Sequence, residues 1–292
     1  MDLTREEMIA MAAKTRTQVM NARVSPELLE RYPAVVAKRL IPTEAGDSPV
    51  YDILPEGGRP QNSRLIINLH GGGFIRERTP NDEVFCRAMS GRTGSRILDV
   101  DYRLVPENPF PAALMESWGV YLWAQQHARE LGCDPARIIL MGHSAGGNLA
   151  CGCTFLARRN GCLPPLRLVL DYPPLDLWMD PGDKKPMGKG IPPERARLYN
   201  LYYCDRSRQQ DPLVSPIYAQ DEDLAGFPGT LVLSAGLDDL CHEAEDFALR
   251  LIRNGAAVTA RRFVHSGHGF TVYRREEYEQ AWDMIGQFIC AE

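Results

Sequence analysis

The sequence predicts an α/β fold, in which a mainly parallel sheet is covered by helices on both faces. Two observations carry this prediction: short, continuous apolar runs that are typical of fully buried strands, and helical repeats between these runs. The apolar runs are residues 65–69, 97–100, 138–141, 166–170 and 231–233. Because strands and helices alternate along the chain, we expect βαβ units that form a doubly wound sheet.

Three helices are expected where apolar residues recur with the spacing of one helix face. The first covers residues 244–252 and stops before Gly255, since glycine commonly follows the end of a helix. The second covers residues 278–289. The third opens at Pro111 and runs to about Gly132.

Length and composition indicate an ordinary globular protein. A chain of 292 residues with 44% hydrophobic content can build one large core, and we assign residues 1–292 to a single domain. The net charge of −5 and the scattered basic residues give no reason to expect nucleic acid, and the basic residues are interpreted as solvated surface. We expect neither a transmembrane helix nor a signal peptide. Eight dispersed cysteines suit a reducing compartment, so we expect a cytoplasmic protein without a metal site.

Two segments interrupt the alternation of strands and helices. Residues 1 to about 40 look helical and precede the first plausible strand. Residues from about 174 to 228 are rich in proline and glycine and include a tyrosine-rich patch at 199–203. A long irregular insertion in a compact fold is usually a lid or a disordered loop. We expect the two segments to pack together as a cap over one end of the sheet.

Residues 142–146 read GHSAG and match the pattern G-x-S-x-G. A chain of this length contains about 0.1 such matches by chance. The strand-like run 138–141 precedes the motif, and a helical stretch of small residues, 147–157, follows it. A strand-to-helix turn this sharp exposes the serine hydroxyl at a helix N-terminus, where the dipole favours developing negative charge. We therefore predict that Ser144 is a nucleophile, the alternative being a glycine-rich connection with an idle serine.

A serine hydroxyl is a weak nucleophile and requires a general base. The six histidines are residues 70, 127, 143, 242, 265 and 268. His268 lies in a Gly-His-Gly loop beyond a strand end, where the imidazole can reach Ser144, whereas His265 ends a strand-like run. The base in turn requires a carboxylate that lies between serine and histidine in the chain. Asp238 and Asp239 both qualify, and the residues alone do not decide between them.

Residues 70–74 read HGGGF and follow the strand-like run 65–69. The glycines either form only a tight turn, or bring bare backbone N–H groups close to negative charge. Attack on an ester carbonyl creates an oxyanion, and its natural donors are N–H groups of such a loop and of the residue after the nucleophile. We predict an oxyanion hole made by Ala145 with Gly72 and Gly73, and Gly71 is the alternative donor.

With these motifs assembled, the chain resembles the hormone-sensitive-lipase-like family of α/β-hydrolase esterases from about residue 64 to 270. The resemblance rests on HGGGF at 70–74, DYRL at 101–104, GHSAG at 142–146 and HGF at 268–270. It implies an α/β-hydrolase fold with an eight-stranded, mostly parallel sheet, a helical cap and no cofactor. It also implies that Asp238 is the triad acid, with Asp239 at a position where the family usually has proline.

The predicted function is a serine carboxylesterase that acts through Ser144, His268 and Asp238 by way of an acyl-enzyme. The expected substrates are short- to medium-chain carboxylic esters, such as acetyl or aryl esters. The alternatives are a small amidase or deacetylase with the same triad, a non-catalytic ligand receptor, and a lyase. The expected partner is a small-molecule ester, without nucleic acid or membrane insertion, and a homodimer stays open. Candidate pocket residues are Phe74, His143, Trp178, Tyr202 and Tyr203, with ordinary packing as the alternative for the cap aromatics.

Overall fold

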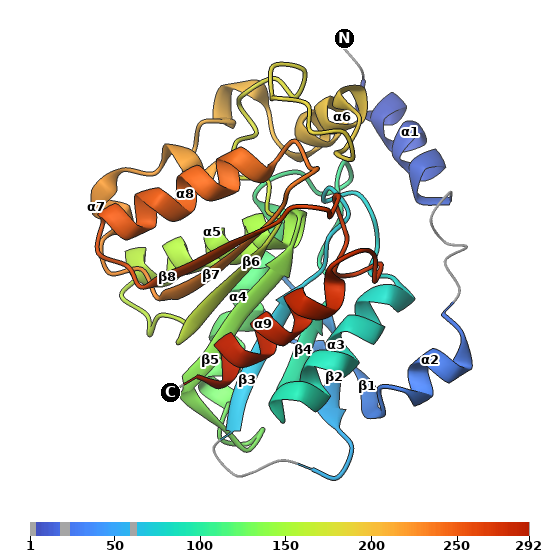
Figure 1. Cartoon of the computed structure of the whole chain (residues 1–292), viewed down its shortest axis with the longest axis vertical. Coiled ribbons are helices and arrows are strands. Elements are labelled where there is room, and N and C mark those ends of the chain that lie inside the picture. Colours follow the sequence, from blue (N-terminus) through green and yellow to red (C-terminus); the bar gives the residue numbers. More distant parts are fainter. Residues whose placement is uncertain (1–3, 18–23, 59–62, 292) are drawn as a thin grey trace.

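A single twisted sheet forms the centre of the molecule, as the computed structural model shows for residues 4–17, 24–58 and 63–291 (Figure 1). Within these ranges, eight strands form one sheet in the order β1-β2-β4-β3-β5-β6-β7-β8. The strands are β1 (Ala34–Ile41), β2 (Ser48–Pro55), β3 (Ser63–Leu69), β4 (Arg96–Val100), β5 (Cys133–His143), β6 (Arg167–Asp171), β7 (Gly229–Ala235) and β8 (Val258–Phe263).

Most neighbouring strands run parallel. The exceptions are at one edge, where β2 pairs antiparallel with both β1 and β4. The other neighbouring pairs, from β4–β3 to β7–β8, are parallel. The predicted eight-stranded, mostly parallel sheet is therefore confirmed, and the carboxyl ends of β3 to β8 meet at one edge of the sheet.

Helices cover both faces of the sheet, and each face has its own apolar core. One core contains buried side chains of α4 (Ala112–His127), α5 (Ala145–Arg159) and α8 (Cys241–Arg253). The opposite core contains side chains of α3 (Pro80–Thr93) and α9 (Tyr278–Cys290). Successive side chains of a strand enter opposite cores, which is why the central strands are apolar throughout.

The N-terminal segment differs from the expectation of helix up to about residue 40. Residues 34–41 form the edge strand β1, whereas helices occupy only α1 (Arg5–Thr17) and α2 (Pro26–Glu30). Most side chains of β1 are exposed or half-buried, so the segment lacks the continuous apolar run of a central strand. An edge strand that is paired on one side only leaves a weak signal in the sequence.

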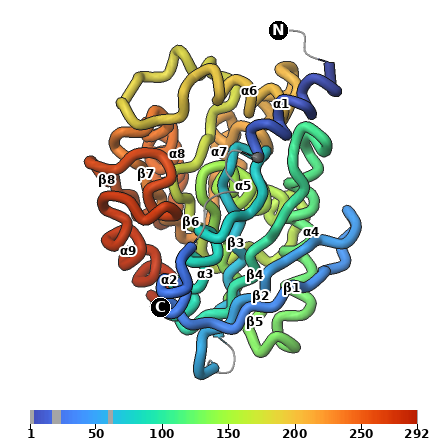
Figure 2. The backbone as a smooth tube through the Cα atoms, turned by 90° about the vertical axis from the view of Figure 1, so that its right-hand side faces the viewer, coloured from blue at the N-terminus to red at the C-terminus, as the bar shows by residue number. Residues whose placement is uncertain are grey.

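The two N-terminal helices lie in different places. In both views α1 is beside α6 (Pro193–Tyr203), at the end of the molecule above the carboxyl edge of the sheet (Figures 1 and 2). The guanidinium of Arg16 holds α1 there, because it donates to the carbonyl oxygens of Ile75 and Val105, at 2.7 Å each, and pairs with Glu107. By contrast, α2 packs against the core of α3 and α9.

The segment between β6 and β7 is mostly irregular. It contains α6, α7 (Asp221–Leu224) and the short 3₁₀ turns η1 (Arg206–Arg208) and η2 (Pro216–Tyr218). Of the helices in the described residues, none is both long enough and apolar enough to cross a membrane.

Candidate active site

Ser144 occupies a sharp turn between β5 and α5. Its backbone has φ 50° and ψ −124°, outside the helical and extended conformations of the residues around it. The turn requires glycine on both sides: a Cβ on Gly142 would overlap the carbonyl of Gly146, and a Cβ on Gly146 would overlap the carbonyl oxygen of Leu69. The hydroxyl therefore stands at the N-terminus of α5, at the carboxyl edge of the sheet.

Three side chains from distant parts of the chain are hydrogen-bonded in series. Nε2 of His268 lies 2.9 Å from the hydroxyl oxygen of Ser144. Nδ1 of the same ring lies 2.6 Å from Oδ2 of Asp238. With Nδ1–H donating to the carboxylate, Nε2 is left free to accept the proton of the hydroxyl. This arrangement matches a nucleophile, a general base and an orienting acid.

The neighbouring aspartate has a different role. Oδ1 of Asp239 accepts the N–H of Met187 at 2.6 Å, so this side chain holds the segment between β6 and β7. Asp238 is fully buried and its Oδ1 accepts the N–H of Leu240 at 3.4 Å. Of the two candidate acids, the structure brings only Asp238 to His268.

The segment between β6 and β7 also supports the loop of the base. The N–H of His268 donates to the carbonyl oxygen of Lys189, and the N–H of Lys189 donates to the carbonyl oxygen of Leu237. Together with the contact of Asp239, these bonds tie residues 187–189 to the loops that follow β7 and β8. The position of the imidazole thus depends on the irregular segment above it.

The other histidine near the turn points away from the serine. The imidazole of His143 is fully buried, packs edge-on against Phe85, and lies 3.4 Å from the carboxylate of Asp171. Burial raises the pKa of Asp171, which also accepts the hydroxyl of Thr271 at 2.5 Å. This buried polar cluster supports the turn from below. His265, the rejected candidate for the base, is exposed.

The glycine loop faces Ser144. Gly72 and Gly73 both have positive φ values, 121° and 62°, and a side chain on Gly73 would overlap the ring of Tyr199. Among the described residues, no backbone hydrogen bond uses the N–H of either glycine. The loop is braced by His70, whose ring stacks on Tyr102 at 4.2 Å. Free N–H groups near a nucleophile are suited to bind an anion.

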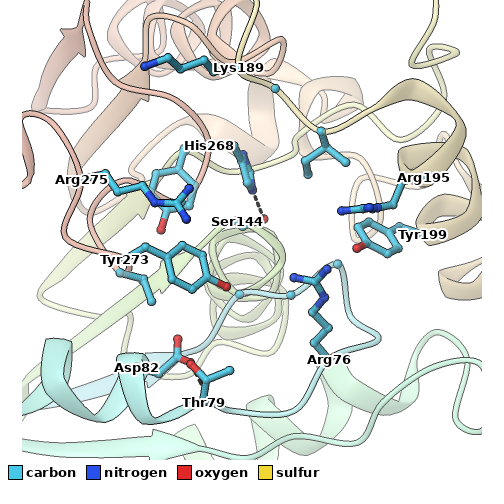
Figure 3. Close-up of a pocket in the computed structure, with 18 of the residues that line it drawn as sticks. Arg76, Thr79, Asp82, Ser144, Lys189, Arg195, Tyr199, His268, Tyr273 and Arg275 are labelled. Carbon is cyan, nitrogen blue, oxygen red and sulfur yellow. Dashed lines mark hydrogen bonds between the residues drawn. The ribbon is translucent and has the colours of Figure 1, made fainter. Parts of the chain in front are cut away.

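A cavity of about 260 Å³ opens at Ser144. Gly71, Gly72, Gly73 and His268 line it, together with four basic side chains and several residues of the segment between β6 and β7. Figure 3 shows the guanidinium groups of Arg76, Arg195 and Arg275 directed into this space from three sides, while the ammonium group of Lys189 points away.

A second, smaller cavity of about 40 Å³ also borders Ser144. Gly73, Ser144 and Tyr199 line both cavities, and Phe74 lines only the smaller one. Because one water molecule requires about 10–15 Å³ of such space, the smaller cavity has room for about three waters. Ile191 also lines both cavities, so Tyr199, which is 8% exposed, and Ile191 both border two spaces of very different size.

Of the five predicted pocket residues, only Phe74 lines either cavity. His143 is directed into the core beneath the turn. Trp178 is covered by the guanidinium of Arg206, 3.5 Å from the ring centroid. Tyr202 and Tyr203 are buried, and Tyr203 stacks on Phe74 at 3.7 Å. Tyr202 and Tyr203 pack inside the protein, because the face of α6 that carries them is turned inward.

Tyr199 and the three arginines line the site although the sequence did not predict them as site residues. Tyr199 lies in the tyrosine-rich patch, and its spacing of three and four residues from Tyr202 and Tyr203 gave a signal that one helix face carries them all. The arginines come from the loop after β3, from the first turn of α6 and from the loop before α9. No local pattern connects them, since only the fold brings these segments together.

Within the described ranges, no cluster of three or more His, Cys, Asp or Glu side chains is arranged to hold a metal ion.

Comparison with known proteins agrees with this geometry. Residues 66–272 match the family described as the alpha/beta hydrolase fold. The chain is 33% identical over 240 residues to a carboxylic ester hydrolase of Mycobacterium tuberculosis. The matched region covers 79% of this chain and 62% of that protein. It is 31% identical over 231 residues to an arylesterase of Saccharolobus solfataricus, covering 78% and 74% respectively. An esterase from Pyrobaculum calidifontis has the same fold with a TM-score of 0.87 and 27% identity, over 99% of this chain and 98% of that one.

The fold and the match over residues 66–272 define an α/β-hydrolase, and the chain belongs to the α/β-hydrolase fold family. It is also 35% identical over 169 residues to mouse hormone-sensitive lipase, which confirms the resemblance seen in the sequence. That match covers 53% of this chain and 22% of the lipase, so the chain spans only about a fifth of that relative's length.

Proposed function

We propose that this protein is a serine carboxylesterase, in which Ser144 is the nucleophile, His268 the general base and Asp238 the orienting acid. The observation that carries the proposal is the pair of hydrogen bonds of 2.9 and 2.6 Å that joins these side chains at the edge of a cavity. The names of the relatives, a carboxylic ester hydrolase and an arylesterase, support an ester as the substrate.

The first half of the reaction forms an acyl-enzyme. Nε2 of His268 takes the proton of the Ser144 hydroxyl as its oxygen attacks the ester carbonyl. Asp238 holds the imidazole in the correct tautomer and stabilises the imidazolium. When the tetrahedral intermediate collapses, the C–O bond of the ester breaks and His268 gives the proton to the departing alcohol.

The second half releases the acid. A water molecule enters where the alcohol has left, and His268 removes its proton as it attacks the acyl carbonyl. Collapse of this second intermediate breaks the bond to Ser144 and returns the proton to the serine oxygen. In both intermediates the negative oxygen is bound by the N–H groups of Ala145, Gly72 and Gly73. One such donor is worth on the order of 10²–10³ in rate.

The two cavities divide the substrate between them. The departing alcohol must receive its proton from His268, which lines the larger cavity but not the smaller one. The alcohol therefore lies in the larger cavity and the acyl group in the smaller one. A space for about three waters accepts a short acyl chain, so acetyl to butyryl esters are the preferred substrates.

The cap consists of α1 and the segment between β6 and β7, which closes over both cavities. Among the described residues the eight cysteines form no disulfide, and six of them are buried. Free thiols are typical of a reducing compartment, so we place the protein in the cytoplasm.

The test compares the wild-type protein with Ser144→Ala and His268→Ala on p-nitrophenyl esters from acetyl to decanoyl. Ser207→Ala and His265→Ala are matched controls, because both side chains are exposed and lie outside the cavities. We expect fast hydrolysis of the short esters by the wild type and both controls, and loss in the other two variants. Equal rates for the wild type and Ser144→Ala would refute the proposal, and faster hydrolysis of matched anilides would indicate an amidase.

A further inference from the structure

The larger cavity carries an unusual concentration of positive charge for an acidic protein. The chain has a net charge of −5, yet four basic side chains line this cavity: Arg76, Lys189, Arg195 and Arg275. The acidic side chains that line it are Glu77 and Asp82. Asp82 is already engaged, because it accepts the N–H and the hydroxyl of Thr79, at 2.8 and 2.5 Å, in the N-terminal cap of α3.

The three arginines have no acidic partner among the described residues. Within the described part of the chain, no ion pair involves Arg76, Arg195 or Arg275, whereas the ammonium group of Lys189 pairs with Glu276 at 3.1 Å. The Nε atom of Arg76 is buried and has no hydrogen-bond partner among the described residues. Unpaired guanidinium groups that face one space repel one another, so an anion in that space is stabilised by all three.

The arginines also surround the position of the alcohol rather than that of the acyl group. None of the three lines the smaller cavity. Figure 3 shows their guanidinium groups around Ser144 and His268, on the side of the larger cavity. Tyr273 lies among them: burial and the charge of Asp82 raise the pKa of its hydroxyl, and the charges of Arg76 and Arg275 oppose that increase.

We propose that the preferred substrate is an ester whose alcohol part carries a carboxylate, which Arg195 and Arg275 bind at the mouth of the larger cavity while Arg76 contributes from the glycine loop. This inference rests on the proposed esterase function and specifies its substrate class. The planar, two-pronged guanidinium matches a carboxylate and forms stronger hydrogen bonds to it than to a neutral group. The cavity of about 260 Å³ is just below the usual range for ligand sites, which suits a small alcohol.

The experiment uses two acetyl esters that differ only in charge, 4-acetoxybenzoate and 4-acetoxybenzamide. The rates of hydrolysis of both esters are measured for the wild type, Arg195→Gln, Arg275→Gln and the double variant. Comparing the ratio of kcat/KM for the two esters between enzymes cancels their difference in intrinsic reactivity. We expect the ratio to fall on the order of tenfold in the double variant, mainly through a higher KM for the benzoate. Rising salt should lower the same ratio in the wild type.

The control variant is Arg197→Gln, on the same helix as Arg195. Arg197 pairs with Asp180 at 2.6 Å and does not line the larger cavity, so we expect the ratio to stay at the wild-type value. A second pair of esters, 4-nitrophenyl hydrogen adipate and 4-nitrophenyl hexanoate, carries the charge or its neutral counterpart on the acyl part. We expect the arginine variants to change the ratio for this pair less than for the acetoxy pair.

Three results would overturn the inference. The first is an unchanged ratio in the double variant, and the second is an equal loss for both acetyl esters, which would mean that the arginines only stabilise the oxyanion. The third is a preference for the adipate ester over the hexanoate ester that depends on the arginines, with no such preference within the acetoxy pair. This result would mean that the arginines bind a carboxylate on the acyl part of the substrate. Failure of the esterase function itself would give a different result, because Ser144-dependent hydrolysis of the neutral 4-acetoxybenzamide would then be absent.

Discussion

The ring of Tyr199, in α6, lies directly against Gly73 of the glycine loop, so closely that any side chain on the glycine would overlap it. The contact joins α6 to the loop that faces Ser144, and both residues line both cavities. Tyr199 is therefore one of the side chains that set the size of the smaller cavity.

Replacing Tyr199 with alanine should merge the cavities and admit longer acyl chains. Because each methylene in an apolar pocket is worth about 1–3 kcal/mol, we expect kcat/KM for the octanoyl ester to rise at least about tenfold relative to the acetyl ester. Measuring rates for p-nitrophenyl esters of increasing chain length tests this. Tyr199→Phe keeps the ring and should retain the wild-type profile. An Ala variant with that same profile would show that another element limits the acyl chain.

Asp238 and Asp239 offer a test of the orienting acid in two adjacent positions. Asp238→Asn should reduce kcat on the order of 10⁴-fold, because an amide cannot hold the imidazole in the required tautomer. Asp239→Asn should reduce it less than about tenfold, since this side chain binds Met187 and not His268. Steady-state kinetics of both variants on p-nitrophenyl acetate decide the matter. A larger loss of kcat in Asp239→Asn than in Asp238→Asn would mean that Asp239 is the orienting acid.

Gly146→Ala should destabilise the fold by more than about 3 kcal/mol, because the added Cβ would overlap the backbone of Leu69 and neither element can move cheaply. The matched control is Gly91→Ala in α3, where a Cβ meets nothing within 4 Å. That variant should gain about 0.5–1 kcal/mol from the higher helix propensity of alanine. Urea denaturation measures both changes in the free energy of unfolding. Similar stabilities would contradict the tight turn described here.

Glu107→Gln should weaken the attachment of α1 in a pH-dependent way. The hydrogen bonds from Arg16 hold the pKa of Glu107 below its ordinary value of 4.5. The carboxylate therefore contributes stability above about pH 4.5, and this contribution is lost as the pH falls through the lowered pKa of the folded protein. At pH 7 we expect the variant to be less stable by about 1 kcal/mol or less, because the carboxylate is partly solvated and solvent screens the pair.

Urea denaturation at pH 7 and pH 3 tests this prediction, and the difference between Glu107→Gln and the wild type should shrink at the lower pH. Glu222→Gln is the control, because Glu222 is exposed and, in the part of the chain that the structure describes, forms no ion pair. It should match the wild type at both values. A constant difference for Glu107→Gln would mean that its effect is not electrostatic.

Much of the fold follows from local patterns. Strands β3 to β7 are buried on both faces, so each left a continuous apolar run, and their alternation with helices predicted a mainly parallel sheet without fixing the order of its strands. The edge strand β1 escaped prediction because its side chains are mostly exposed. A short local motif also predicted the candidate nucleophile, since the turn around Ser144 leaves glycine as the only residue that fits at 142 and 146.

The remainder of the site was decided by tertiary structure. Whether Asp238 or Asp239 faces His268 depends on how the loop after β7 is held by the cap, and the two residues are equivalent in the sequence alone. The gathering of Arg76, Arg195 and Arg275 around one cavity left no pattern at all. Backbone geometry acts between neighbours and is written in short motifs, whereas charge acts through space between segments that only the packed core brings together.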